Sequence, residues 1–308
     1  MRIIKRKILL PLLFVLEMRL CCSPVLARGP GTSGAVFLKI DMGARAASMG
    51  GAFCAVADDV SAIYWNPAGL VQLERKEITA MHNEWIQGIR RESIVYAHPI
   101  KELLTLGVGI TYLYTSGLIK RDIYGNELGE TFGAYGGVTT FSGSKMLCEN
   151  VSIGVNLKII QEGIEARKAT AFALDIGVLY KLSKLRLGAV IQNLGTKVKF
   201  EEKSFALPLD LKAGLAYKAL EHLILATDID LPLDNEINLR VGAEYQLADL
   251  LSLRLGFKTS QAKNTGVGIS GGLGFRFKDY QLDYGFLPFG DLGNTHRISF
   301  SARFGKKK

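Results

Sequence analysis

Residues 104–114 read LTLGVGITYLY and alternate between two kinds of side chain almost without error. Leu104, Leu106, Val108 and Ile110 fall on one face, and the residues between them are threonine or glycine. Because successive side chains of a β-strand point to opposite faces, this segment predicts a strand that separates an apolar medium from a polar one. A soluble sandwich and a membrane barrel both fit that pattern.

The same rhythm recurs from residue 77 to the C-terminus and predicts fourteen strands. Their predicted ranges are 77–83, 91–98, 103–114, 131–141, 150–161, 169–181, 184–193, 208–218, 222–231, 236–247, 250–259, 265–278, 279–287 and 295–304. Several connections, such as 182–183 and 248–249, are short enough for hairpins, which implies an antiparallel up-and-down meander. Only two connections, 115–130 and 195–207, are predicted to be long loops.

Hydropathy and charge favour the membrane barrel over the sandwich. Mean hydropathy is +0.17 over 308 residues, yet no apolar run reaches the roughly 18 residues of a spanning helix. The polar faces carry charged residues at mid-strand: Lys158, Asp175, Arg186, Lys212, Asp228, Arg240, Arg254, Arg276, Asp283 and Arg297. A closed barrel places these charges in a polar lumen and leaves no strand edge in hydrocarbon. We therefore predict an all-β fold, a transmembrane antiparallel barrel of about 14 strands.

The first 27 residues have the layout of a secretory signal peptide. Four basic residues within 2–7 precede a short apolar core at 8–16, and Val25-Leu26-Ala27 offers a small-residue cleavage site. The segment carries five cations and one acid, so its removal lowers the net charge from +9 to about +5. That charge is too modest and scattered to indicate nucleic-acid binding.

Cysteine usage indicates neither a disulfide framework nor a metal site. Cleavage after Ala27 leaves Cys54 and Cys148, which are far apart in sequence, and no Cys/His spacing resembles a zinc site. We predict no metal and no cofactor.

Residues 28–76 do not alternate and are rich in glycine and alanine. They contain GARAASMGGAF at 43–53 and AVADDVSAIYWNPAGL at 55–70. Asp59 or Ser61 can cap a short helix that Asn66-Pro67 ends, because a residue before proline avoids the helical region. A compact segment too small for a domain predicts a plug in the lumen, followed by a barrel over 77–304 and a basic tail over 305–308.

This segment resembles the N-terminal hatch of FadL-type outer-membrane transporters, in which an Asn-Pro-Ala motif follows an acidic, helix-forming run. The two quoted stretches, together with PFGDLGNTHRISFSARF at 288–304, are closer still to the PorV/PorQ family of that superfamily. The resemblance implies that the hatch or gating motif consists of Gly50, Gly51, Asp58, Asp59, Asn66, Pro67 and Ala68. A structural alternative stays open, in which Asn66-Pro67 ends a helix and the glycines only permit tight packing.

The resemblance implies two competing functions. In the first, a non-enzymatic barrel acts as a shuttle for type IX-like protein secretion, with secretion-system proteins and secreted cargo as partners. In the alternative, it is a FadL-like transporter for long-chain fatty acids or other hydrophobic molecules. A nonspecific pore is a third reading. Mixed charges on the lumen wall are expected to pair with one another or with Arg45, Asp58 and Asp59, because unpaired charge in a confined lumen is costly.

Each of these readings places the chain in the outer membrane of a Gram-negative-type bacterium, surrounded by lipid. The barrel assembly machinery is then a further partner, and Phe304, the aromatic residue that ends the last predicted strand, is the candidate recognition signal. Three basic residues follow the Gly305 that succeeds it, so the aromatic is not C-terminal.

Two sequence patterns suggest enzymes and are set aside. GVGISG at 266–271 fits a dinucleotide fingerprint, and GISGG at 268–272 fits a nucleophile elbow. Both motifs need a strand-to-helix turn, but both lie in a predicted strand. The four histidines have no recognisable catalytic context, so a lumenal Ser–His esterase is a weaker alternative; they are His82, His98, His222 and His296.

Overall fold

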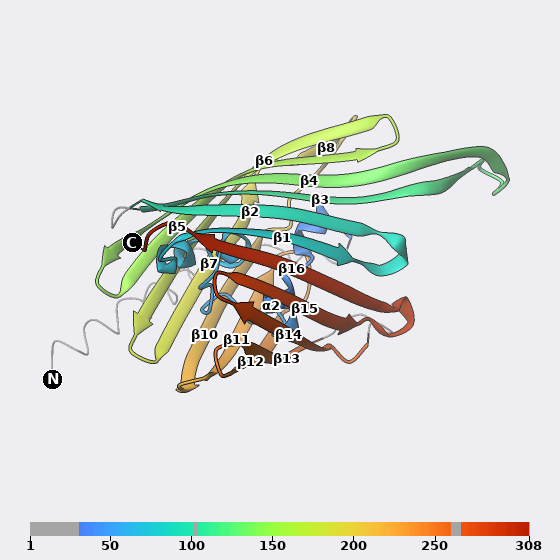
Figure 1. Ribbon diagram of the computed structural model, residues 1–308. Helices are drawn as coiled ribbons and strands as arrows, with labels where there is room; N and C mark the ends of the chain where they lie inside the picture. Colours follow the sequence, from blue (N-terminus) through green and yellow to red (C-terminus); the bar gives the residue numbers. More distant parts are fainter. Residues whose placement is uncertain (1–30, 101–103, 260–265, 308) are drawn as a thin grey trace.

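The computed structural model describes residues 31–100, 104–259 and 266–307 (Figure 1). The predicted signal peptide and the first residues of the predicted hatch lie outside these ranges. Among the described residues, no helix is both long enough and apolar enough to cross a membrane.

Fourteen strands close into one antiparallel barrel in which each strand pairs with its neighbours in chain order, apart from the small β8–β9 hairpin, and β1 pairs with β16. The strands are β1 (Lys76–Glu84), β2 (Arg90–Ile100), β3 (Leu104–Arg121), β4 (Glu127–Cys148), β5 (Val151–Ile164), β6 (Arg167–Leu182), β7 (Leu185–Gly195), β10 (Asp210–Leu220), β11 (Leu223–Pro232), β12 (Asn238–Leu247), β13 (Leu251–Lys258), β14 (Ile269–Phe277), β15 (Tyr280–Pro288) and β16 (Asn294–Phe304). The predicted fold class and the predicted strand number are confirmed.

The two long loops were predicted wrongly. Most of 115–130 extends β3 and β4 into a long hairpin, which projects from the barrel in Figure 1, and register shifts after Thr115 and Ile119 keep its strands paired. Asp122 closes its turn, since its carboxylate accepts hydrogen bonds from the backbone of Tyr124 and Asn126. The 195–207 connection contains a second small hairpin, β8 (Val198–Phe200) with β9 (Lys203–Phe205). Turn-forming residues such as Gly117 and Asp122 hid the strands in the first stretch, and the second hairpin was missed because β8 and β9 have only three residues each.

The two faces of β3 meet different surroundings, as the alternation predicted. Leu106 and Ile110 are 47% and 56% exposed, whereas Thr105 and Thr111 are fully buried. Most of the other strands also expose large apolar side chains on their outer faces, among them Leu157, Phe172 and Phe275. Such an outer face suits hydrocarbon, and barrel closure pairs the backbone groups that hydrocarbon cannot solvate.

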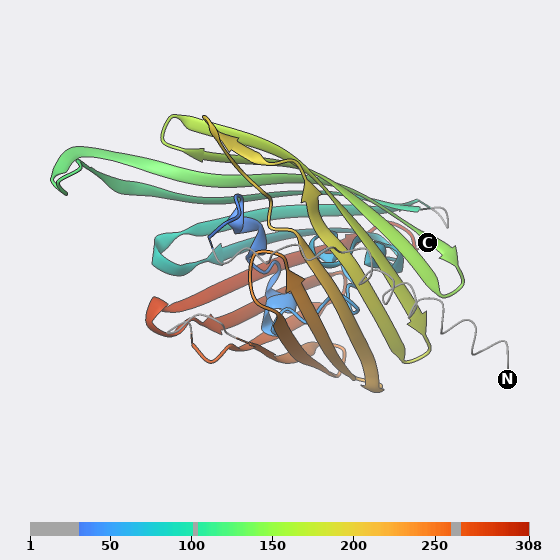
Figure 2. The same ribbon diagram turned by 180° about the vertical axis from the view of Figure 1, so that it is seen from behind.

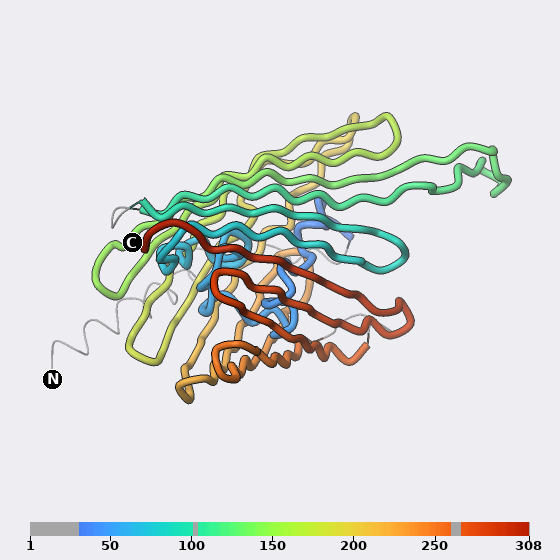
Figure 3. Tube along the Cα trace, viewed as in Figure 1, coloured from blue at the N-terminus to red at the C-terminus, as the bar shows by residue number. Residues whose placement is uncertain are grey.

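The two ends of the barrel differ. Short turns such as 149–150 and 183–184 join strands at the end where the C-terminus lies (Figure 3). The opposite end carries the long β3–β4 hairpin, the β8–β9 hairpin and two short 3₁₀ turns, η3 (Ile86–Gly88) and η4 (Gly290–Leu292). Outer-membrane barrels typically have short periplasmic turns and longer extracellular loops. We therefore call these the short-turn end and the long-loop end.

Residues 31–75, which we call the lumen segment, lie inside the ring of strands (Figure 2). Its elements are η1 (Val36–Lys39), α2 (Ala44–Ser48), α3 (Ala62–Trp65) and η2 (Pro67–Gln72). α2 packs on β13 to β16, while η2 packs on β3 to β6, so the segment touches opposite arcs of the wall. α3 ends directly before Asn66-Pro67, where the proline rule predicted a helix to stop.

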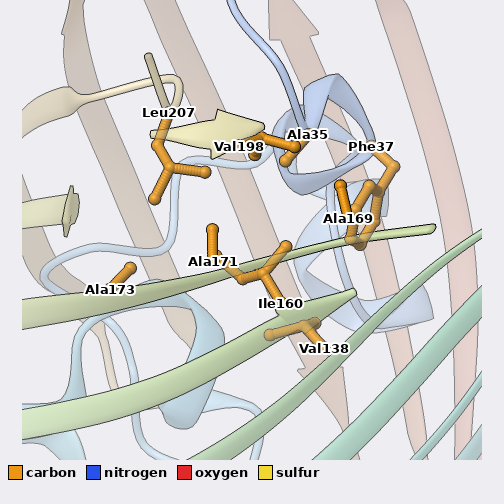
Figure 4. Packing of buried hydrophobic residues seen from close by; sticks show 9 residues of the cluster. All are labelled: Ala35, Phe37, Val138, Ile160, Ala169, Ala171, Ala173, Val198 and Leu207. Atoms are coloured by element: carbon orange, nitrogen blue, oxygen red, sulfur yellow. The ribbon is translucent and has the colours of Figure 1, made fainter. Parts of the chain in front are cut away.

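The first turn of the lumen segment packs into an apolar corner near the long-loop end. Figure 4 shows Ala35 and Phe37 of η1 beside inward-facing residues of the wall and of the β8–β9 hairpin. Those neighbours are Val138, Ile160, Ala169, Ala171, Ala173, Val198 and Leu207. Burying such a patch is a main source of stability for a packed segment.

Substitution by arginine at two depths of the outer face tests whether that face contacts lipid. Leu255 lies near the middle of β13 on the outer face and is 68% exposed. We expect Leu255→Arg to lower the free energy of unfolding in lipid vesicles by about 2–4 kcal/mol, because arginine at the bilayer midplane must be dehydrated. Leu247→Arg, at the short-turn end of β12, is the control and should cost roughly 0–1 kcal/mol. Equal costs measured by denaturant titration would contradict the lipid-facing assignment.

Candidate functional site

Eight glycines of the barrel wall allow the lumen segment to lie directly against it. They form four cross-strand pairs: Gly154–Gly177, Gly188–Gly214, Gly242–Gly256 and Gly272–Gly285. A Cβ atom built on Gly177 would lie 2.1 Å from Oδ1 of Asn66, and one on Gly154 would lie 2.2 Å from the carbonyl carbon of Pro67. Backbone therefore meets backbone at distances that only glycine permits.

The Asn-Pro-Ala motif fastens the lumen segment to β6. The fully buried Asn66 amide donates to the carbonyl oxygens of Cys54 and Val178, both at 3.0 Å, and its Oδ1 accepts from the Ala68 amide. Pro67 begins η2, where its missing N–H leaves no unpaired donor. The motif thus ties two turns of the segment to each other and to the wall. Whether it also gates passage stays a prediction.

The paired glycines predicted in the hatch lie against β12, β13 and β14. Gly50 and Gly51 both have positive φ, 66° and 77°. The Gly50 amide donates to Ser270 Oγ at 3.0 Å, and a Cβ on Gly51 would lie 1.9 Å from Nη1 of Arg240. These positions require glycine for both conformation and space.

Arg45 is the centre of the largest charge network. Its guanidinium contacts Asp58 at 2.6 Å and Asp59 at 2.8 Å within the segment, and it donates two hydrogen bonds of 2.7 Å to Glu244 of β12. Arg254 of β13 contacts the same Glu244 at 2.6 Å. The network continues to the wall residues Asp283, 2.7 Å from Arg254, and Arg186, 3.1 Å from Asp58.

The network also sets the charge state of Asp58. Burial opposes ionisation of this carboxyl, but the Arg45 and Arg186 guanidiniums outweigh burial and hold its pKa below the ordinary value. Asp58 therefore stays charged at neutral pH and keeps both arginines satisfied.

A second network holds the segment nearer the long-loop end. Arg240 contacts Asp41 at 2.8 Å and the wall residue Asp230 at 2.5 Å. Lys258 approaches the Asp41 carboxylate at 3.8 Å. Asp228 accepts from the backbone amides of Phe53 and Cys54 at 2.8 and 2.7 Å, so this carboxylate binds the segment without a cation.

The remaining predicted lumen charges lie in separate places. Lys158 and Asp175 form an ion pair of 2.7 Å on the wall, and Asn156 bridges Asp175 to the carbonyl of Ile63. Arg297 donates to the carbonyl of Asp41 at 2.6 Å. All ten charged residues predicted on the polar faces have inward-facing side chains, but they are spread along the lumen wall and form no single cluster.

The candidate enzyme motifs have no catalytic geometry. Residues 266–268 precede strand β14, and no helix follows it. Ser270 is buried and hydrogen bonded to the lumen segment, whereas His82 and His296 lie on the outer face, bound to Glu92 and Tyr284. The described residues include no cluster of three or more His, Cys, Asp or Glu side chains arranged for a metal ion.

Phe304, the proposed assembly signal, ends β16 on the outer face and stacks on Tyr96 with ring centroids 6.2 Å apart. This contact does not test recognition by the barrel assembly machinery, so that role stays a prediction.

A cavity of about 540 Å³ separates the lumen segment from the wall at the long-loop end. One part of its lining is apolar and includes Leu38, Ile40, Trp85, Leu287 and Phe289. The other part is charged and includes Asp41, Lys212, Asp230, Arg240 and Lys258. The volume lies within the range of small-molecule sites, and the mixed lining suits a mostly apolar solute that carries a polar group.

Solved structures that share this architecture include a toluene transporter and a FadL homologue. The Ralstonia pickettii toluene transporter TbuX matches with a TM-score of 0.62 and 13% identity over 86% of this chain and 98% of its own. A Pseudomonas aeruginosa FadL homologue matches with a TM-score of 0.63 and 11% identity, over 86% and 98%. At these identities the likeness shows the fold, an outer-membrane-type β-barrel like those of FadL homologues.

The family follows from the sequence comparison. A family model described as "Uncharacterised protein family (UPF0164)" matches residues 27–302, and the chain belongs to this family. A UPF0164 protein of Treponema pallidum (strain Nichols) is 22% identical over 281 residues, covering 83% of this chain. The chain spans 65% of the length of that relative. The PorV/PorQ assignment made from the sequence is not confirmed by these matches; the FadL-like part of it is supported.

Substitution of a wall glycine tests the docking of the lumen segment. We expect Gly177→Leu to displace Asn66 and expose the segment, because the new side chain needs the space that Oδ1 of Asn66 occupies. Trypsin should then cut the segment at the otherwise buried Arg45 while the barrel stays intact. Gly143→Leu is the control, since a Cβ there meets only Leu106 at 4.0 Å. Equal protease resistance of the two variants would refute close docking at Gly177.

The Arg45 network predicts a pH dependence. Because the pKa of Asp58 is lowered in the folded protein, its stabilisation is complete above the unfolded pKa of about 3.9 and is lost as pH falls through the folded value. We expect Asp58→Asn to cost about 1.5–3 kcal/mol at pH 7, because charge-assisted hydrogen bonds are lost. The difference from wild type should shrink below about pH 4. Unfolding titrations at pH 3 to 7 check this, with exposed Asp291→Asn as the control; a pH-independent difference would contradict it.

Proposed function

We propose that the protein is a FadL-like outer-membrane channel for small hydrophobic molecules, the alternative function considered from the sequence. The observation that carries the proposal is the cavity beside the lumen segment, in a barrel whose fold matches hydrocarbon channels. Apolar residues of the segment and of the wall offer a solute a surface that water solvates poorly. The lumen segment lies between this cavity and the short-turn end of the barrel.

The charged part of the cavity restricts which solutes fit. An apolar solute would deprive the charged groups of water. Here the carboxylates and cations are already paired with one another across the lumen, so they do not need that water. A solute therefore lies against Trp85, Leu287 and Phe289 and leaves the ion pairs intact. The type IX shuttle reading rests on the PorV/PorQ resemblance alone, and the structural neighbours favour the channel.

Uptake of radiolabelled solutes by cells tests the proposal. In a Gram-negative host without its own FadL-type transporters, we expect this protein to raise uptake of toluene or oleate but not of a sugar. Leu38→Trp fills the cavity from η1 and should reduce that uptake several-fold. Leu255→Trp places the same side chain on the lipid-facing wall and should leave uptake unchanged. Uptake of both solutes equal to that of the empty host, with the barrel present in the membrane, would contradict the proposal.

A further inference from the structure

Four arginines of the described residues are almost completely buried in the lumen, with 1–3% of their surface exposed: Arg91, Arg240, Arg254 and Arg297. Arg240 and Arg254 each contact two carboxylates. Arg91 and Arg297 form no ion pair with any carboxylate in the described part of the chain. A buried guanidinium without an anionic partner is costly, so these two arginines need an explanation.

The two unpaired arginines flank one asparagine. Asn83 of β1 is directly opposite Arg91 of β2 and, on its other side, directly opposite Arg297 of β16. Asn83 is fully buried, and both its amide nitrogen and its amide oxygen lack a hydrogen-bond partner. The Nε atoms of Arg91 and Arg297 lack one as well. Three neighbouring side chains thus present three unused N–H donor groups at one level of the wall.

The nearest carboxylate is held elsewhere. Arg91 and Arg297 donate to the backbone carbonyls of Ile40 and Asp41, at 2.5 and 2.6 Å. The carboxylate of Asp41 itself contacts Arg240 at 2.8 Å. Backbone carbonyls satisfy some of the donors but neutralise none of the charge. The positions of the three side chains are therefore set by the strand register and the lumen segment, while no carboxylate of the described residues is in direct contact with either guanidinium.

Space for a small guest adjoins this cluster. A cavity of about 40 Å³ lies beside Arg91 and is also lined by Lys158, Lys212 and Thr140, whose hydroxyl has no partner. That volume exceeds the roughly 10–15 Å³ that one water needs. Trp85, which lines the larger cavity, covers Arg297 with its ring centroid 5.4 Å from the guanidinium. The smaller cavity thus reaches Arg91, and Trp85 connects Arg297 to the larger one.

We propose that Asn83, Arg91 and Arg297 form a binding site for a monovalent anion, either a halide or a carboxylate group. An anion accepts the unused N–H groups and neutralises two buried cations, and charge-assisted hydrogen bonds of this kind are stronger than neutral ones. The site goes beyond the proposed channel function, because a bound anion would fasten β1, β2 and β16 to the lumen segment whether or not a solute passes.

Anomalous diffraction from crystals of the full-length protein soaked in sodium bromide tests the site. We expect a bromide peak within hydrogen-bond distance of Nε of Arg91 or Arg297. Loss of the peak in Arg91→Gln, with retention in Arg276→Gln, would support the assignment. Arg276 is a matched control because it is a lumen-wall arginine near the short-turn end that contacts Gln281 and no carboxylate in the described chain. Only water, or no density, at the wild-type cluster would overturn the proposal, even if Arg91→Gln fails to fold.

A second soak distinguishes the two anion classes. Crystals soaked with bromide and decanoate together should lose the bromide peak if the site takes the carboxylate of an amphipathic solute. A bromide peak that persists assigns the site to a small inorganic ion. Either outcome retains the anion site, and neither depends on uptake measurements, so its failure can be distinguished from failure of the channel proposal.

Discussion

Closure of the sheet is the constraint on which the rest of this structure depends. Hydrocarbon cannot solvate a backbone N–H or carbonyl, so every strand that faces lipid needs a partner on both sides, and β1 must return to β16. Closure in turn creates an interior that must be filled or wetted. In this chain residues of the lumen segment fill it, and the polar faces of the strands meet that segment instead of an open water channel.

Two kinds of contact make that filling compatible with a narrow barrel. Four cross-strand glycine pairs bring the wall backbone against the lumen segment, as at Gly154, where it meets the backbone of Pro67. Ion pairs such as Arg45–Glu244 and Arg240–Asp41 then join charges that neither lipid nor a dry interior tolerates alone. Removing one partner of such a pair costs more than the pair contributes, which explains why both sets of charges persist together.

The sequence predicted much of the fold because period-two alternation is strong in a barrel with one apolar face. Leu104 to Tyr114 and its thirteen counterparts gave every barrel strand, and the glycine-rich stretch before them indicated a separate segment. The failures have physical causes. Turn residues such as Gly117 and Asp122 resemble a loop although the strands continue through bulges. Glycine pairing and the Asn83 cluster depend on strand register, which one sequence does not show. The sequence did hold one clue to the glycine pairs: glycines recur on the polar face of several alternating strands, at positions such as Gly154 and Gly177.

The FadL-like part of the family resemblance is supported by the fold of the structural neighbours, whereas the PorV/PorQ assignment is not confirmed. The ends of the chain suggested a secretion shuttle, whereas the structural neighbours and the cavity support the channel that we propose. We propose that the lumen segment closes the barrel to water and ions. Recording of the full-length protein in planar lipid bilayers tests it most directly. We expect only small, infrequent currents from the intact chain and steady currents after deletion of residues 31–75; large steady currents from the intact chain would contradict closure by the lumen segment.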